Sequence, residues 1–370
     1  YEDISHMLWR TGELVKALSL TQKALELAEK LGNPEILAEC YNNLGILSGK
    51  SGEIEKNMRY WEQGLKMAVE NNCTKPALRL YNNLGSTYWF TGEFQKTFET
   101  AQKGSELAKK VGDLKYISYL DLMLAFCYMC MGETQKAISM AEDVLALDKR
   151  TRNTVHISSV MFGLGWCYQI LGEWDKSLRY LMEALDNAKK VGEYQDSGGA
   201  TFLLGELFMD MEDYVEAEKY YDECSTIYEK AGDTEAQFTD LFQALSKLYL
   251  KKGEIEKAKE LIEKTYEHHT TKTKNKLYIA DAEMLKGMLF REQKNWEQSI
   301  QHFEKSLQGY RSLNAQEWWV QKYAELLYEY GLMHLNRNKE GDKEKAYSLL
   351  NQALEIYQKI DAKKKIEKII

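Results

Sequence analysis

The residues best suited to chemistry in this sequence are its cysteines and histidines, and their spacing indicates neither a metal site nor a catalytic centre. Cys127 and Cys130 stand three positions apart on an expected helix. A structural zinc site needs about four ligands, and no second Cys or His pair follows at a matching distance. His268 and His269 precede a polar run that we expect to form a loop, and the other histidines stand far from one another. We therefore predict no metal site and buried thiols.

Catalytic and nucleotide-binding motifs are missing as well. The glycine-containing segments "SGGATFLLG" and "GLGW" lack the lysine and the preceding strand that a phosphate-binding loop needs. No serine or cysteine stands in a strained nucleophile turn with a base nearby. We predict that the chain is not an enzyme and uses no cofactor.

Composition describes a folded, acidic chain. The 370 residues carry 57 acidic and 49 basic side chains, a net charge of −8, which repels phosphate backbones, so we expect no nucleic-acid partner. No uncharged apolar run is long enough to span a bilayer, no signal peptide occurs, and the six cysteines are scattered. We therefore expect a cytoplasmic protein with reduced thiols that does not enter membranes. The chain opens on Tyr1, which suggests a piece of something longer.

A fixed period divides the chain into nine helix-turn-helix units. Gly-Glu pairs recur about every 40 residues, a period within the range of known repeat proteins. Two later steps are each one position longer, and the last step is stretched further. The turns stand at Gly12-Glu13, Gly52-Glu53, Gly92-Glu93, Gly132-Glu133, Gly172-Glu173, Glu212-Asp213, Gly253-Glu254, Lys294-Asn295 and Gly341-Asp342. Apolar residues at i, i+3, i+4 and i+7 flank each turn, which predicts two amphipathic helices per unit.

At these residues the chain resembles the tetratricopeptide-repeat family over essentially its whole length. The family's small residue of the first helix falls on Gly45 and Gly85, and that of the second helix falls on Ala17. Helices that approach closely must meet at such residues. The resemblance implies an all-α fold, a right-handed superhelical solenoid of about nine repeats. Repeats 1–7 would span residues 1–267, and repeats 8–9 with a C-terminal capping helix would span residues 268–370. Repeats of this length are similar to those of polarity adaptors, kinesin light chains and sensor domains of signalling ATPases.

The family places partner-binding side chains on the first helices, which line a concave wall. In the second and third repeats those positions carry asparagine pairs exactly one period apart, together with other polar and aromatic side chains. An amide offers one donor and one acceptor, as each unit of an extended peptide does, so the pairs could grip a peptide backbone. These residues are Asn42, Asn43, Arg79, Asn82, Asn83, Ser86 and Trp89. The alternative is that the asparagines merely bond a neighbouring helix.

The next repeats carry aromatic and then acidic side chains at the same positions. Aromatic residues there predict either ordinary core or an apolar wall that a ligand, a partner helix or another copy covers. Acids there would attract a basic group of the ligand, although most acids between 206 and 240 belong on solvated helix faces. The wall is Phe126, Phe162, Trp166 and Phe202, and the acidic end is Glu206, Asp210 and Asp240.

Three functions fit these observations. The first is a non-catalytic scaffold that binds a peptide or partner protein, with basic residues in that ligand. The second is the sensor or autoinhibitory part of a longer signalling or regulatory protein. The third is a structural module that forms a homo-oligomer, for example through end surfaces such as Trp318 and Trp319, which cannot share one helix face.

Overall fold

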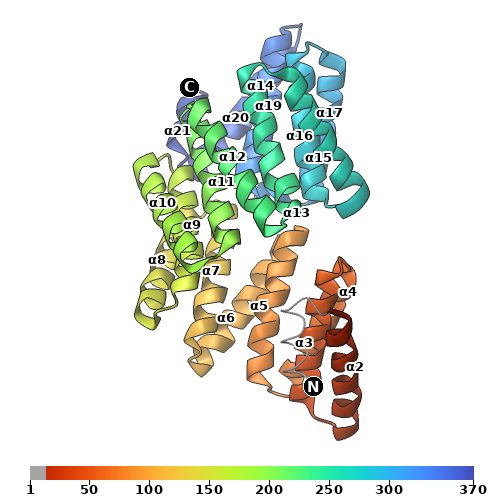
Figure 1. Cartoon of the computed structure of the whole chain (residues 1–370). Coiled ribbons are helices and arrows are strands. Elements are labelled where there is room, and N and C mark those ends of the chain that lie inside the picture. The colour runs from red at the N-terminus through yellow and green to blue at the C-terminus, as the bar shows by residue number, and fades with distance from the viewer. Residues whose placement is uncertain (1–13) are drawn as a thin grey trace. The chain divides into compact units, whose positions relative to one another are not determined.

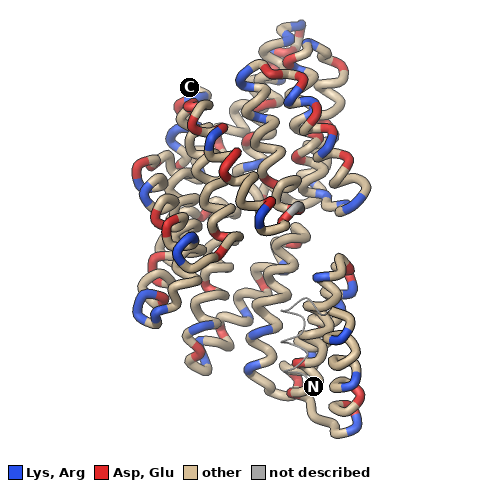
Figure 2. Tube along the Cα trace, viewed as in Figure 1, with Lys and Arg blue, Asp and Glu red and all other residues tan. Residues whose placement is uncertain are grey.

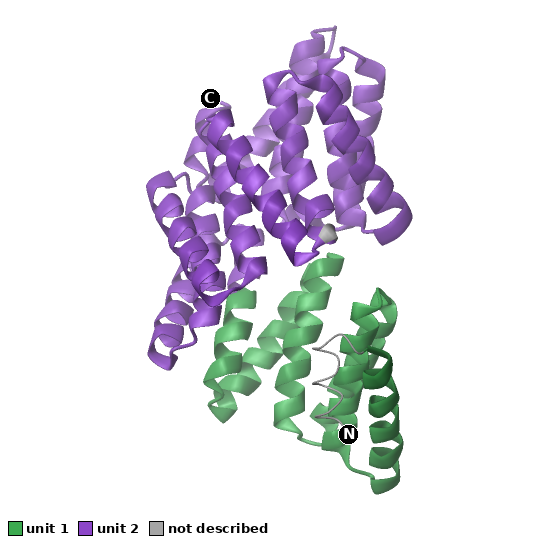
Figure 3. Ribbon diagram, viewed as in Figure 1, with its two compact units in different colours: residues 1–124 green, residues 125–370 purple. Residues whose placement is uncertain are grey.

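The computed structural model describes residues 14–370 as helices joined by short turns (Figure 1). The first expected turn, Gly12-Glu13, lies outside the described residues. The chain divides into two compact units, residues 1–124 and 125–370, which Figure 3 shows in separate colours. The division of the repeats at residue 267 that the sequence suggests stays a prediction.

Within residues 14–370 every regular element is a helix, which confirms the predicted all-α class. Unit 1 contains α2 (Leu14–Leu31), α3 (Pro34–Lys50), α4 (Ile54–Glu70), α5 (Thr74–Thr91), α6 (Phe94–Val111) and the first part of α7 (Leu114–Cys130). Unit 2 contains the end of α7 and then α8 (Thr134–Thr151), α9 (Thr154–Ile170), α10 (Trp174–Val191), α11 (Tyr194–Asp210), α12 (Tyr214–Ala231), α13 (Thr234–Ala236), η1 (Gln237–Leu241), α14 (Phe242–Lys252), α15 (Ile255–His268), η2 (His269–Thr273), α16 (Lys276–Glu292), α17 (Trp296–Ser312), α18 (Ala315–Trp318), α19 (Val320–Arg337), α20 (Asp342–Lys359) and α21 (Lys363–Glu367). In this described range, none of the helices is long and apolar enough to cross a lipid bilayer.

Left-handed residues end the helices at nearly regular intervals along the chain. At the turn that the sequence marks with Gly92, φ is +79°, and the N–H of Glu93 donates to the carbonyl oxygen of Tyr88 at 2.8 Å. Glycine takes this conformation without the steric cost that a side chain brings. A second set of such turns joins each repeat to the next, and there the left-handed residues include Gly112 and Arg152. Each repeat therefore contains two turns of one kind, of which the Gly-Glu period reveals only the first.

The small residues of the first helices let the second helices approach closely. A Cβ added at Gly45 would overlap the indole ring of Trp61. The same approach lets polar side chains reach backbone carbonyl oxygens in the core: Asn57 Nδ2 donates to the carbonyl oxygen of Gly45 at 2.7 Å, and Ser177 Oγ donates to that of Gly165 at 2.8 Å. Asn57, which stands where the family has alanine, is therefore held in the core by a hydrogen bond instead of by its small size.

Two π-helical turns account for the longer period that begins after Glu212. η1 lies between the left-handed residues Gly232 and Gly253, and η2 lies between Gly253 and Lys274. Each of these intervals is one position longer than the intervals between the left-handed residues that precede Gly232. A π turn holds one residue more than an α turn, so it absorbs the extra residue inside the helix. The loop expected after His268 is therefore wrong, because most of that run is η2.

Candidate functional site

Of the two asparagine pairs in unit 1, one is buried and the other is partly exposed. Asn42 and Asn43 on α3 are each 1% exposed, whereas Asn82 and Asn83 on α5 are partly exposed. Asn83 Nδ2 donates to Asn42 Oδ1 at 2.9 Å, so the two repeats are joined amide to amide. Neither amide atom of Asn43 has a hydrogen-bond partner in the described chain. Only Asn82 and Asn83 of the four thus have surface to offer a ligand in this structure.

The other candidates of unit 1 already have partners within the unit. Arg79 Nη1 lies 2.8 Å from Glu39 Oε2, which occupies the same position one repeat earlier. Ser86 Oγ donates to the carbonyl oxygen of Asn82 at 3.0 Å. Trp89 packs edge-on against Phe94, with ring centroids 5.5 Å apart. The charge of Arg79 is therefore already matched within unit 1.

Three of the four residues of the predicted aromatic wall of unit 2 form one contact network. Phe126, Phe162 and Trp166 are partly exposed, and their ring centroids lie 6.1–6.4 Å apart pairwise. Trp319, which immediately precedes α19, packs edge-on against Trp166 at 6.2 Å. Phe202 packs against Tyr221 instead. Trp319, from a later repeat of unit 2, thus covers part of this wall.

The predicted acids of unit 2 belong to a larger group that we call the first-helix charge cluster. Acidic and basic residues are interleaved along the whole described trace (Figure 2), so location sets this group apart. Its members come from the first helices of successive repeats and from α21, and electrostatic interactions link them. They are Glu206 and Asp210 on α11, Asp240 on η1, Lys247 on α14, Asp281 on α16, Lys322 and Glu325 on α19, and Lys365 on α21. Five carboxylates and three ammonium groups give it a net charge of −2 when all are ionised.

Most members of the cluster are paired. Lys247 contacts Glu325 at 2.6 Å and Lys322 contacts Asp281 at 2.6 Å. Lys365 contacts Asp210 at 2.5 Å, which fixes α21 beside α11 (Figure 1). Burial disfavours the charged form of Lys247, but Glu325 and Glu206 outweigh burial and raise the pKa of this lysine.

Two carboxylates are less well compensated. Burial raises the pKa of Glu206, which accepts a hydrogen bond from the Tyr221 hydroxyl at 2.5 Å. Burial also raises the pKa of Asp240 to about 6, since Lys322 opposes this effect only in part and Asp281 adds to it. The carboxylate of Asp240 makes no hydrogen bond or ion pair with any other residue of the described range. It is the uncompensated charge of the cluster.

Sequence reasoning found three of the five acids of this cluster and missed Asp281, Glu325 and the lysines. The signal was present, because Lys247 follows Glu206 by one repeat period and Asp281 follows Asp240 by one as well, at the same repeat positions. The position of Lys365 carries no such signal. Its partner Asp210 is 155 residues away in the sequence, and only the folded unit 2 brings the two together.

Thiol chemistry is not what these residues offer. All six cysteines are free, and burial raises the pKa of Cys127 to about 12, so this thiol stays protonated at neutral pH.

Among the residues described, one group of three side chains lies within reach of a single metal ion, namely Glu235, His268 and His269.

Comparisons with known proteins agree with this architecture. Models of the tetratricopeptide repeat match residues 116–190, 200–235 and 239–267. No curated sequence matches the chain. A Rap protein complexed with competence and sporulation factor is similar in structure, with a TM-score of 0.71, 16% identity and coverage of 97% of both chains.

Two further solved structures are similar. The Rap conjugation gene regulator of plasmid pLS20, in complex with the Phr* peptide, has a TM-score of 0.63 and 15% identity, and the match covers 77% of this chain and 76% of that one. Aspartyl phosphate phosphatase F from Bacillus subtilis has a TM-score of 0.58 and 14% identity, with 96% and 93% covered. Identities this low show a shared fold alone. Together with the repeated two-helix unit, the matches confirm the predicted superhelical repeat fold, and the chain is a tetratricopeptide-repeat protein.

Proposed function

We propose that this protein is a non-catalytic scaffold for a peptide or partner protein, and that the first-helix charge cluster holds a cationic group of the ligand. The observation that carries the proposal is Asp240, a carboxylate without a hydrogen-bond or ion-pair partner in the described chain. An unpaired carboxylate in a site that raises its pKa is unfavourable. A lysine, an arginine or an amino terminus of the ligand supplies the missing charge.

Neighbouring features support a peptide rather than a small cation. The aromatic side chains of Phe126, Phe162 and Trp166 lie in the same unit and offer apolar contacts to side chains beside the cationic group. Two proteins of similar fold are described as complexes, one with the Phr* peptide and one with competence and sporulation factor. Binding without catalysis and a cytoplasmic location belong to the same proposal.

The test is a binding screen against immobilised random hexapeptides with free amino termini, followed by fluorescence anisotropy on the best peptide. We expect enrichment of lysine, arginine or a free terminal amine. Asp240→Asn should weaken the best peptide by about 10- to 100-fold, as expected for the loss of one charged hydrogen bond. Asp186→Asn is the matched control, because it removes an exposed carboxylate on α10 that pairs only with Lys190 within its own helix. Equal affinity of both variants would refute the role of the cluster.

A second candidate, the sensor or autoinhibitory part of a longer protein, is favoured by Lys365. This lysine already occupies Asp210 within the cluster, so α21 and a ligand cation compete for the same acids. Under this hypothesis, a variant that ends at Asp361 binds the selected peptide more tightly than the full chain. Unchanged affinity would argue against it. Self-assembly stays a prediction, and light scattering over a range of concentrations tests it.

A further inference from the structure

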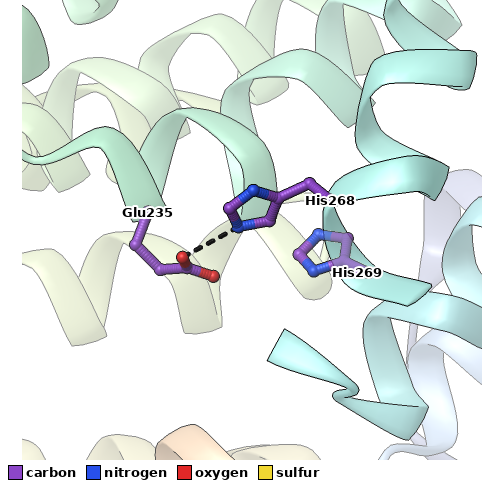
Figure 4. A group of neighbouring side chains, drawn as sticks. All are labelled: Glu235, His268 and His269. Atoms are coloured by element: carbon purple, nitrogen blue, oxygen red, sulfur yellow. Dashed lines mark hydrogen bonds and ion pairs between the residues drawn. The ribbon is translucent and has the colours of Figure 1, made fainter. Parts of the chain in front are cut away.

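Three potential metal ligands of unit 2 converge although the sequence separates them. Glu235 lies on α13, whereas His268 and His269 stand where α15 passes into η2. One ligand atom from each side chain lies within 4.8 Å of the other two, and Figure 4 shows the side chains turned toward one another. The sequence analysis considered only the histidine pair. The fold brings the carboxylate of Glu235, from the first helix of the same repeat, next to that pair.

Both imidazole rings are fixed in place before any ion arrives. His268 stacks face to face on Phe238, with centroids 4.0 Å apart and planes 4° from parallel. His269 stacks on Tyr278 at 5.0 Å and is fully buried. A preformed site loses little side-chain entropy when it binds, which favours affinity.

Hydrogen bonds fix the tautomer of His269. Its Nε2 lies 3.3 Å from the carbonyl oxygen of Phe238, which can only accept, so Nε2 carries the proton and Nδ1 carries the lone pair. Orientation by a backbone carbonyl is what metal-binding histidines show. The hydroxyl of Thr273 now donates to Nδ1 at 3.1 Å and can rotate away when an ion binds.

The three ligand atoms must rearrange around an ion, and two of them are already in contact. His268 Nε2 lies 2.9 Å from Glu235 Oε2. Ligand atoms around a tetrahedral ion stand roughly 3.4 Å apart, because each lies about 2.0–2.2 Å from the metal. The carboxylate can adjust, since 53% of its side-chain surface is exposed. His268 Nδ1 is buried and has no partner in the described chain, so packing alone leaves this ring incompletely satisfied.

We propose that Glu235, His268 and His269 bind one divalent transition-metal ion of the zinc type. Two imidazoles and one carboxylate form a ligand set that leaves a fourth position for water or for a group from a ligand. Imidazole selects zinc, nickel, cobalt or copper over magnesium and calcium. The ion would join the first and second helices of one repeat beside their two π turns. The three ligands are not members of the charge cluster, although Asp281 of that cluster interacts electrostatically with His269. The proposed ion does not depend on the proposed peptide ligand.

Isothermal titration of the untagged, chelator-treated protein with Zn²⁺ tests the proposal. We expect one equivalent per chain, an increase in melting temperature on binding, and at least tenfold weaker binding by Glu235→Gln and by His268→Phe. The phenylalanine keeps the stack on Phe238, and circular dichroism checks that both variants fold. The control His156→Gln disrupts another histidine–carboxylate contact, that with Asp148 at 2.6 Å, and should bind zinc as the wild type does.

Substitution with Co²⁺ separates these ligands from the thiols. We expect visible bands of a tetrahedral cobalt site without a sulfur-to-cobalt charge-transfer band. A charge-transfer band, the absence of saturable binding, or unchanged affinity in both Glu235→Gln and His268→Phe would each overturn the proposal.

Discussion

The two units treat their polar first-helix residues differently. In unit 1 the arginine is paired with a glutamate, and an asparagine of one repeat bonds an asparagine of the previous one. In unit 2 the corresponding positions carry more charge, and Asp240 remains without a partner in the described chain. Pairs of the first kind hold repeats together. An unmatched charge of the second kind can be neutralised by a cationic group of a ligand, and this is why our proposal places recognition in unit 2.

The largest effect on stability is expected when a buried ion pair of unit 2 is broken, in contrast to a more exposed ion pair of unit 1. Arg291 Nη1 lies 2.6 Å from Glu329 Oε2 in unit 2, and the two side chains are 6% and 7% exposed. Arg291→Met leaves the glutamate buried and unpaired, and should lower the free energy of unfolding by about 3–5 kcal/mol. Arg79→Met, which breaks a pair whose arginine is 40% exposed, should cost about 1 kcal/mol or less. Urea denaturation followed by circular dichroism measures both.

The double variant Arg291→Met/Glu329→Gln is the control, since it removes both charges and should recover most of the loss. If Arg291→Met and Arg79→Met cost the same, the energetic contrast between the units does not exist.

A smaller effect is expected from the titration of Asp240. A pKa raised to about 6 means that the folded state disfavours the ionised carboxylate. The penalty is fully present above pH 6 and disappears as the pH falls toward the unfolded pKa near 4. Asp240→Asn should therefore stabilise the protein on the order of 1–3 kcal/mol at pH 7.5 and have little effect at pH 3.5.

Lys322, Asp281, Glu206 and Asp233 interact electrostatically with Asp240, so melting temperatures of the wild type and Asp240→Asn are compared at each pH. Their difference then isolates the one carboxylate. A difference that does not change between pH 3.5 and 7.5 would contradict the raised pKa.

Two adjacent asparagines of unit 1 should change the stability of the protein in opposite directions when each is replaced by leucine. Asn43→Leu removes a buried amide without a partner in the described chain and should raise stability by about 1 kcal/mol. Asn42→Leu removes the hydrogen bond to Asn83 and should lower stability by about 1 kcal/mol. Thermal unfolding compares the two. Because Asn43 is 1% exposed, its variant should also keep wild-type affinity for a ligand, and lost affinity would restore this residue to the binding surface.

The smallest effect concerns α21. Lys365→Met removes an ion pair whose lysine is 42% exposed, so we expect a stability loss of about 1 kcal/mol or less. Hydrogen exchange of residues 363–370 should become faster, and affinity for a cationic peptide should rise a few-fold. Lys363→Met is the control, because that side chain is 59% exposed and lies 3.8 Å from Asp361. Identical exchange in both variants would show that Lys365 does not hold the helix.

Repetition explains what the sequence could and could not predict. Turns such as Gly92 and close approaches such as that at Gly45 recur at one spacing, so these glycines, together with the apolar periodicity, made the fold readable. Three of the five acids of the charge cluster followed from repeat positions, and Lys247 would have followed from the same rule. Burial of Asn42 could not be inferred, because a repeat position specifies a face and not the depth of a side chain. The contacts of Lys365 and Trp319 with earlier helices depend on how unit 2 folds back on itself.

The two π turns show how a chain of repeats can tolerate one additional residue in a helix. One residue inserted into a straight helix turns every later side chain by about 100° around the axis, which would destroy all downstream faces. η1 and η2 confine that rotation to a single turn, so Asp281 still follows Asp240 in register. Each π turn thus accommodates one extra residue locally. The second of them begins within the pair of adjacent histidines, His268 and His269, and no other repeat of the sequence contains such a pair.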